Sequence, residues 1–144
     1  MVDELDDLRD AITSGDYALA LAIIDELDEM SRSDKINKIK SYMRVLLTHL
    51  IKQDAEQRST RSWADSIDES LDSIADTNKR PKSGGYYLDD EALASALEES
   101  WRRALRKAAR EAFEGQYEPD KLEGMISREA ILHDALDRIR ETQA

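Results

Sequence analysis

Residues 42–52, "YMRVLLTHLIK", decide the fold, because their apolar side chains recur at the spacing of a buried helix face. The same spacing of three and four residues continues upstream to Ile36. Ser33 is the expected N-cap, and the helix is expected to end at about Gln57. The pattern therefore predicts a long amphipathic helix. Its apolar seam consists of Ile36, Ile39, Met43, Leu46 and Leu50.

Two shorter helices are predicted before this one. In the first, Leu5, Leu8 and Ile12 recur at helical spacing. Gly15 suits the left-handed conformation that ends a helix, and Asp16 can cap the next start. The second helix is expected to end near residue 31, and its apolar stripe consists of Ala20, Ile23, Leu27 and Met30.

Another helix is predicted shortly after position 57, with Thr60 or Ser62 as its cap. A short connection makes consecutive helices antiparallel neighbours, so we expect a central antiparallel hairpin that folds back near Arg58. The apolar seam of this second arm consists of Trp63, Ile67, Leu71 and Ile74.

His49 lies at the edge of the first arm's seam, and the hairpin places it level with Ile67 and Asp68 of the second arm. This position predicts a half-buried imidazole. A half-buried imidazole needs a hydrogen-bond partner, and Asp65 and Asp68 are the nearest candidates.

The rest of the chain predicts a loop and two C-terminal helices. Residues 77–87 combine proline, paired glycines and cations without periodicity, which is typical of a loop. Asp89 or Asp90 opens a helix over 89–113, and Ser127 opens a last helix over 127–141. We therefore expect an all-α bundle of five or six helices that forms one domain over residues 1–144.

Composition limits the class of protein. The 144 residues carry a net charge of −11 and no cysteine, which excludes disulfides and thiolate metal sites. No apolar run approaches the length that a bilayer requires, and the acidic start does not look like a secretory signal, so a cytoplasmic location is expected. The charge is unevenly distributed: residues 1–31 have net −9 and residues 32–61 have net +5.

Three linked segments resemble a known family: "ELDEMSRS" at 26–33, "RVLLTHLIK" at 44–52 and "RSW" at 61–63. They look like the core of the domain-of-unknown-function 29 family, small helical proteins that are frequent in cyanobacteria. The resemblance implies an all-helical fold with a family-like core over about residues 15–76, and it implies no established activity. The matching positions are Glu26, Leu27, Met30, Arg32, Ser33, Arg44, Leu46, Leu47, His49, Leu50, Lys52, Arg61, Ser62 and Trp63.

The sequence offers no motif for catalysis, so no catalytic residue, metal or cofactor is predicted. Only His49 and His133 are present, and no glycine-rich phosphate loop, nucleophile elbow or zinc-protease motif occurs. The dipeptide His133–Asp134, with Asp137 one turn later, faintly resembles metal phosphohydrolases, but such sites need more ligands than this chain offers.

Two basic surfaces are candidate functional sites. The first, which we call the hairpin patch, would support nucleic-acid binding or a metal-independent nuclease. The second is a cationic stripe on one side of the helix over 89–113, suited to phosphate contacts. The hairpin patch consists of Arg44, His49, Lys52, Arg58, Arg61 and Trp63, and the stripe of Arg102, Arg103, Arg106, Lys107 and Arg110.

The function that we predict from the sequence is a non-enzymatic protein-interaction module: an adaptor, regulator or inhibitor. Its partner would be another protein with a basic surface, because the acidic segments favour fast, oriented encounter with one. Nucleic acid is the alternative partner, opposed by the net charge of −11. A homodimer fits the pattern as well, because helical hairpins readily pair, whereas a membrane partner is not expected.

Overall fold

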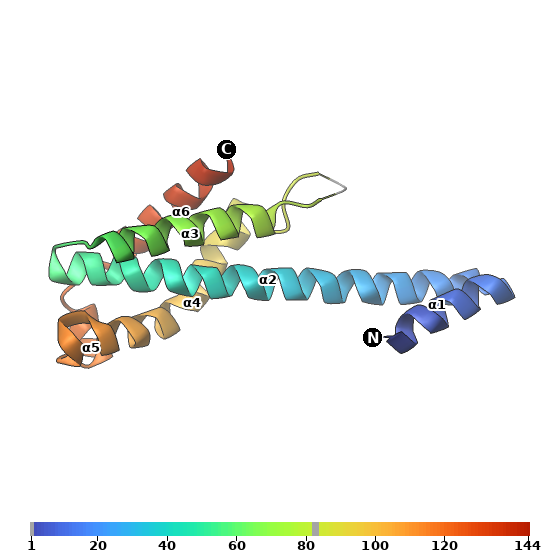
Figure 1. The fold of residues 1–144 in the computed structure, drawn as a ribbon, viewed down its shortest axis with the longest axis horizontal. Coiled ribbons are helices and arrows are strands. Elements are labelled where there is room, and N and C mark those ends of the chain that lie inside the picture. Colours follow the sequence, from blue (N-terminus) through green and yellow to red (C-terminus); the bar gives the residue numbers. More distant parts are fainter. Residues whose placement is uncertain (1, 82–83) are drawn as a thin grey trace. The chain divides into compact units, whose positions relative to one another are not determined.

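The protein is described here by a computed structural model that covers residues 2–81 and 84–144. Its six α-helices and one 3₁₀ segment confirm the predicted all-α bundle (Figure 1). Within these ranges there is no strand, only an isolated bridge between Lys79 and Tyr86, and no helix has the length and apolarity to cross a membrane. The elements are α1 (Val2–Ser14), α2 (Tyr17–Glu56), α3 (Arg61–Asn78), α4 (Asp90–Glu111), η1 (Ala112–Gly115), α5 (Pro119–Glu123) and α6 (Arg128–Gln143).

The predicted break between two helices at residues 31–33 is wrong, because α2 is continuous from Tyr17 to Glu56. Neither glycine nor proline occurs in this range. Ser31 and Ser33 adopt helical backbone, and serine inside a helix costs only a few tenths of a kcal/mol relative to alanine (~0.5). A serine is an N-cap only where its own backbone is extended, which nothing enforces here.

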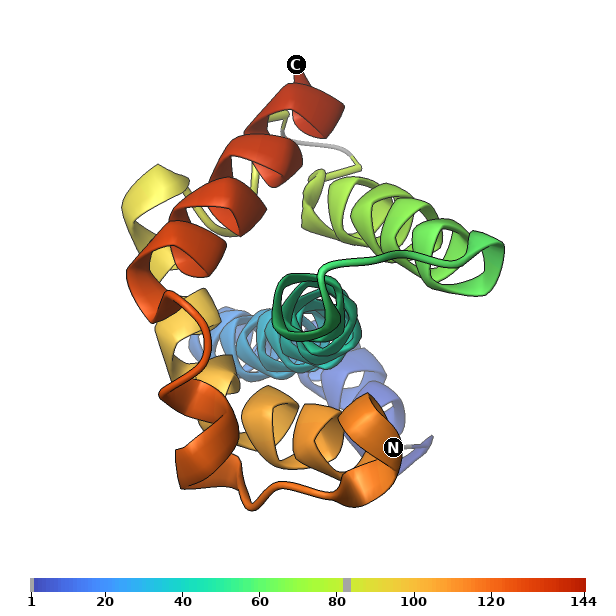
Figure 2. The same ribbon diagram turned by 90° about the vertical axis from the view of Figure 1, so that its left-hand side faces the viewer.

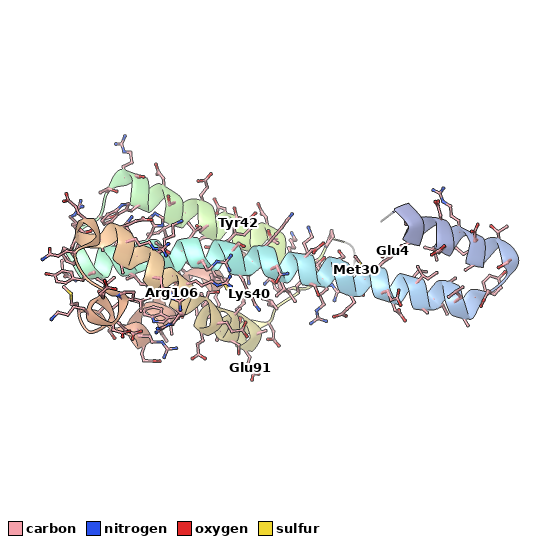
Figure 3. The ribbon with its side chains drawn as sticks, turned by 90° about the horizontal axis from the view of Figure 1, so that it is seen from below. Glu4, Met30, Lys40, Tyr42, Glu91 and Arg106 are labelled. Atoms are coloured by element: carbon pink, nitrogen blue, oxygen red, sulfur yellow. The ribbon has the colours of Figure 1, made fainter. Side chains whose placement is uncertain are left out.

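The chain forms two compact units, residues 1–35 and 36–144. The first unit is a helical hairpin of α1 and the start of α2 (Figure 3). Gly15 makes the turn with a φ of 79°, and the Asp16 carboxylate accepts a hydrogen bond from the Leu19 amide at 3.1 Å. The two arms meet at small side chains, since Ala11 and Ala20 are buried. The glycine stop and the aspartate cap are as predicted.

The second unit packs around the C-terminal part of α2. Met43, Leu46, Leu47 and Ile51 of α2 have no exposed area. Figure 2 looks along α2 and shows α3, α4 and α6 arranged around it. Helix α3 runs back along α2 from the turn at residues 57–60, which is the predicted hairpin. The other helices contribute Ile67, Ile74, Leu93, Leu97, Trp101, Leu105, Ile131, Ala135 and Ile139 to this core.

Local capping signals set the helix starts in this unit. Thr60 caps α3 through its hydroxyl oxygen, which accepts from the Trp63 amide at 3.1 Å. Asp89 caps α4 by accepting from the Ala92 amide at 2.9 Å, and Ser127 caps α6. Each of these residues has extended backbone, as a cap requires. Of the alternatives that the sequence left open, the structure selects Thr60 and Asp89.

The helix predicted over 89–113 ends two residues early, at Glu111. Phe113 and Glu114 adopt left-handed backbone with φ of 51° and 57°, a conformation that is strained for residues with a side chain. Glu56 holds this turn in place, because its Oε2 accepts a hydrogen bond from the Phe113 amide at 3.2 Å. The contact comes from α2, so the local sequence does not reveal it.

Asn78 fastens the connection between α3 and α4. Its side chain is fully buried and is satisfied on both sides: Nδ2 donates to the Leu88 carbonyl at 3.0 Å, and Oδ1 accepts from the Leu88 amide at 2.8 Å. Nδ2 also donates to Gln143 Oε1 on α6 at 2.9 Å. The predicted loop over 77–87 is thereby tied to two helices, although residues 82 and 83 lie outside the described residues.

We expect Leu46→Ala to lower the free energy of unfolding of the second unit by about 2–5 kcal/mol, because it leaves a cavity at a fully buried site. Met125→Ala, at an exposed apolar side chain, should change it by about 0.5 kcal/mol or less. Urea unfolding followed by tryptophan fluorescence measures both, since Trp63 and Trp101 lie in this unit. Equal losses in the two variants would contradict the assigned core.

Candidate functional site

Two ion pairs fix how α2 and α4 pack. Lys40 Nζ lies 2.7 Å from Glu99 Oε2, and Lys52 Nζ lies 2.7 Å from Glu111 Oε1. Both pairs join residues 59 positions apart, so the two helices run in the same direction (Figure 1). The same offset sets Arg44 opposite Arg103.

A groove with a volume of about 440 Å³ lies between α2 and α4, between these two ion pairs; we call it the basic groove. Five of its eight lining side chains are cations, two carry hydroxyl groups, and none is acidic. Figure 3 marks Lys40 on α2 and Arg106 on α4. The lining residues are Ser41, Arg44, Val45, Thr48, Arg103, Arg106, Lys107 and Arg110.

The α2 side of the basic groove is ordered by short hydrogen bonds. The Thr48 hydroxyl donates to the Arg44 carbonyl at 2.6 Å, and Arg44 Nη2 donates to the Ser41 hydroxyl at 3.0 Å. An adjoining hollow shares Ser41, Arg44 and Arg103 and continues to the Lys40–Glu99 pair. The cations are therefore presented along one continuous surface of the second unit.

The electrostatics of the basic groove differ from those of the surrounding surface. Among the residues that the structure describes, none of the five groove cations has a carboxylate within 4.0 Å, whereas seven other lysines and arginines of the second unit do. Like charges brought together without counter-charge repel one another and cost free energy. An anion bound in the groove would remove that cost.

The predicted cationic stripe divides at this groove. All five of its side chains are exposed, as expected, but only four of them line the groove. Arg102 is outside the groove lining, and its Nη1 lies 4.0 Å from Asp120 Oδ1. Arg102 is therefore a natural control for the other four.

The hairpin patch also divides. Lys52, Arg58 and Trp63 come together, because both cations lie over the indole ring at 4.7 Å from its centroid. Lys52 is buried and its charge is paired with Glu111, and Arg58 Nε is paired with Glu56 Oε1 at 3.0 Å. These contacts join α2, α3 and α4, so this cluster stabilises the fold. Arg44 lies instead in the basic groove, and Arg61 is exposed at the start of α3.

His49 is half-buried, as predicted, but the expected partner was wrong. Its Nδ1 bonds to the Val45 carbonyl of its own helix at 2.9 Å, rather than to Asp65 or Asp68 on α3. The Val45 carbonyl lies one helical turn before His49, so the short imidazole side chain can reach it within the same helix. A carboxylate on α3 could contact His49 only if tertiary packing brought the two side chains together. His49 does not line the basic groove.

The second histidine makes a surface pair. His133 Nδ1 lies 3.3 Å from Asp137 Oδ2, one turn along α6, and Asp134 pairs with Arg138 at 3.1 Å. In the described ranges no group of three or more histidine, aspartate or glutamate side chains is placed to hold a metal ion.

Sequence reasoning missed the link between Arg44 and the stripe. It grouped Arg44 with His49 and Lys52, which are close in sequence, but His49 does not line the groove and Lys52, although it also lies beside α4, is buried in its pair with Glu111. Helical angles separate Arg44 from His49 by about 140°, and this spacing was the one available signal against grouping them.

Comparison with known proteins identifies the class and then the family. The helical fold defines a small all-α protein, with a groove that is lined mostly by cations. A model of the family described as Domain of unknown function DUF29 matches residues 20–133, so the chain belongs to the DUF29 family. The match extends beyond the segment that carried the sequence resemblance and includes the whole groove. No curated protein and no solved structure matches the chain.

We expect Lys52→Met to lower the free energy of unfolding by about 1–3 kcal/mol, because it removes a charged hydrogen bond and the contact with Trp63 while keeping the apolar stem. Arg61→Met, the same type of change at an exposed position, should alter it by about 0.5 kcal/mol or less. Urea denaturation of the two variants measures the difference. A Lys52 variant as stable as the wild type would contradict the structural role.

Proposed function

We propose that this protein is a non-enzymatic protein-interaction module, an adaptor, regulator or inhibitor, that docks through its N-terminal helical hairpin. The docking surface, which we call the hairpin surface, lies on α1 and on residues 17–30 of α2. Its partner is another protein with a basic, partly apolar surface. The proposed location is the cytoplasm. The chain has no cysteine, so its folding does not require the oxidising compartment in which disulfides form.

The observation that carries the proposal is the exposure of apolar side chains. Of nine large apolar side chains that are exposed in the described ranges, seven lie in residues 1–35 and two in the much longer second unit. Concentrated exposed apolar area marks an interaction surface, whereas isolated exposed residues do not. The seven are Leu5, Ile12, Tyr17, Leu19, Leu21, Ile24 and Met30.

Helical spacing arranges part of this apolar area into stripes. Tyr17, Leu21 and Ile24 are separated by four and three residues and share one face of α2, and Leu5 and Ile12 share one face of α1. Leu8 and Ala11 of α1 face the hairpin's own interior instead, since they are half-buried and buried. The exposed stripes therefore do not take part in the packing between the two helices of the hairpin.

Charge selects the kind of partner. Residues 1–31 hold ten acidic residues and one arginine, net −9. Two copies that met through this surface would bring like charges together, which is destabilising, whereas a basic surface would be attracted and oriented. The hairpin surface therefore favours a basic protein over a second copy of this chain.

The alternative function, a nucleic-acid-binding protein or metal-independent nuclease at the hairpin patch, has less support. The residues of the hairpin patch do not share one surface, because Lys52 is buried in an ion pair, Arg44 lies in the basic groove and His49 lies outside that groove.

A photo-crosslinking amino acid placed at Leu21 of the full chain tests the docking surface in cells. We expect it to capture a protein with a basic surface, and the same group at Asp68, exposed on α3, to capture none. Capture of only a second copy of the chain, or only of acidic proteins, would contradict the proposal.

The purified partner then provides the quantitative test. Leu21→Ser/Ile24→Ser should weaken its binding by about tenfold or more, because two exposed apolar contacts are lost. Met125→Ser, at an exposed apolar side chain of the second unit, should leave the affinity unchanged. Helix content by circular dichroism should be equal in the three proteins, and an unchanged affinity of the double variant would overturn the assignment.

A further inference from the structure

We propose that the basic groove between α2 and α4 binds the sugar–phosphate backbone of a single-stranded nucleic acid. This inference goes beyond the proposed function, and it concerns a different surface with residues that the hairpin surface does not include. The groove unites Arg44 of α2 with four cations of α4, a combination that neither candidate surface contained by itself.

The residue types in the groove match phosphate recognition. Four of its five cations are arginines, whose planar fork donates two parallel hydrogen bonds to phosphate oxygens. The hydroxyl groups of Ser41 and Thr48 donate to carbonyl groups of α2 itself, and Ser41 Oγ accepts from Arg44 Nη2 at 3.0 Å, so they hold Arg44 in place while the cations make the phosphate contacts. Phosphate contacts of this kind supply most of the affinity in sequence-independent binding.

The absence of carboxylates in the groove lining points to a ligand rather than to a structural role. Elsewhere between α2 and α4, cations are paired across the interface, as in Lys40–Glu99 and Lys52–Glu111. Glu99 lines the adjoining hollow, where its carboxylate is paired with Lys40. Between those two pairs, Arg44 lies opposite Arg103 in a groove whose eight lining residues include no acid. Structural packing would favour an opposite charge at such a position, whereas binding of a polyanion needs both cations free.

The lining favours a nucleic-acid backbone over an acidic protein segment. Val45 is the sole apolar residue among the eight that line the groove. Protein interfaces depend on buried apolar or aromatic anchors surrounded by a polar rim, and a groove of cations and hydroxyls offers almost no such anchor. A phosphodiester backbone needs none.

The size of the groove favours a single strand. The groove between α2 and α4 has a volume of about 440 Å³, so it can hold a short stretch of one backbone but not a duplex. No aromatic side chain lines the groove, so bases cannot stack on the protein there, and binding is expected to be indifferent to base identity.

The net charge of −11 does not oppose binding at this place. At physiological ionic strength, charges farther than about 8 Å are largely screened, so the five clustered cations determine the local potential. The consequence is a steep dependence on salt: with three to five phosphates neutralised, the slope of log K against log salt is about −2 to −3.5 for a single strand.

The test uses the full-length protein and a fluorescein-labelled twelve-residue oligo(dT), with binding measured by fluorescence anisotropy over a range of salt. We expect Arg44→Gln and Arg103→Gln each to weaken binding about threefold or more and to reduce the salt slope by about 0.7, since each removes one phosphate contact. Arg102→Gln, one residue away on the same helix but outside the groove, should change neither quantity.

Stability and competitors complete the design. Arg44→Gln and Arg103→Gln should unfold at the wild-type temperature or above, because they relieve repulsion, so lost binding cannot come from lost structure. Oligo(dA) should bind like oligo(dT), whereas duplex DNA and poly-glutamate should bind at least about tenfold more weakly. The hairpin-surface variant Leu21→Ser/Ile24→Ser should bind the oligonucleotide normally, which separates this inference from the proposed function.

Three results would overturn the proposal. An effect of Arg102→Gln as large as that of Arg103→Gln would assign binding to the general surface of α4. If poly-glutamate bound as tightly as oligo(dT), the groove would instead be a site for acidic protein segments. If oligo(dT) showed no measurable binding at low salt, the groove would not be a nucleic-acid site.

Discussion

Burial of one wide apolar face of α2, between residues 39 and 51, is the constraint on which the rest of the second unit depends. Six side chains of this face are almost fully buried: Ile39, Met43, Leu46, Leu47, Leu50 and Ile51. Such a face is too wide for one neighbour, so α3, α4 and α6 all pack around it (Figure 2). The remaining positions of α2 carry the polar chemistry of the molecule. Arg44 and Thr48 therefore face the basic groove beside α4.

Buried polar groups join the helices at the points where apolar packing alone would leave them unspecified. Lys52 pairs with Glu111 and lies over Trp63, which sets the register of three helices at one end of the core. Asn78 fastens the chain before α4 to α6 through bonds that use both of its amide hydrogens and its oxygen. Each of these groups is satisfied by its partners, so its burial does not carry the cost of an unpaired polar atom.

The two units differ in the chemistry of the surfaces that they expose. The hairpin of residues 1–35 is acidic and exposes seven large apolar side chains, which suits a basic protein. The second unit is well packed and presents its least compensated charge in one groove, which suits a polyanion. On the two proposals together, this protein would bring a basic protein and a single-stranded nucleic acid close to each other, and each contact is testable without the other.

The sequence by itself determined the helices, because helix formation depends on interactions within a few residues. Periodic apolar positions, Gly15, and the caps Thr60, Asp89 and Ser127 act locally, and so they could be read correctly. The resemblance at residues 26–63 was also sufficient to assign the family, since it rests on identity of residues rather than on geometry. The serines at 31 and 33 misled because the same residue is tolerated inside a helix and favoured at its start, and only the rest of the chain decides which.

Tertiary structure alone decided the partner of His49, the strained turn held by Glu56 and the basic groove. The groove joins residues that are 59 positions apart, and its charge depends on two helices running in the same direction. No local pattern specifies that direction, because it follows from how the whole apolar face of α2 is covered.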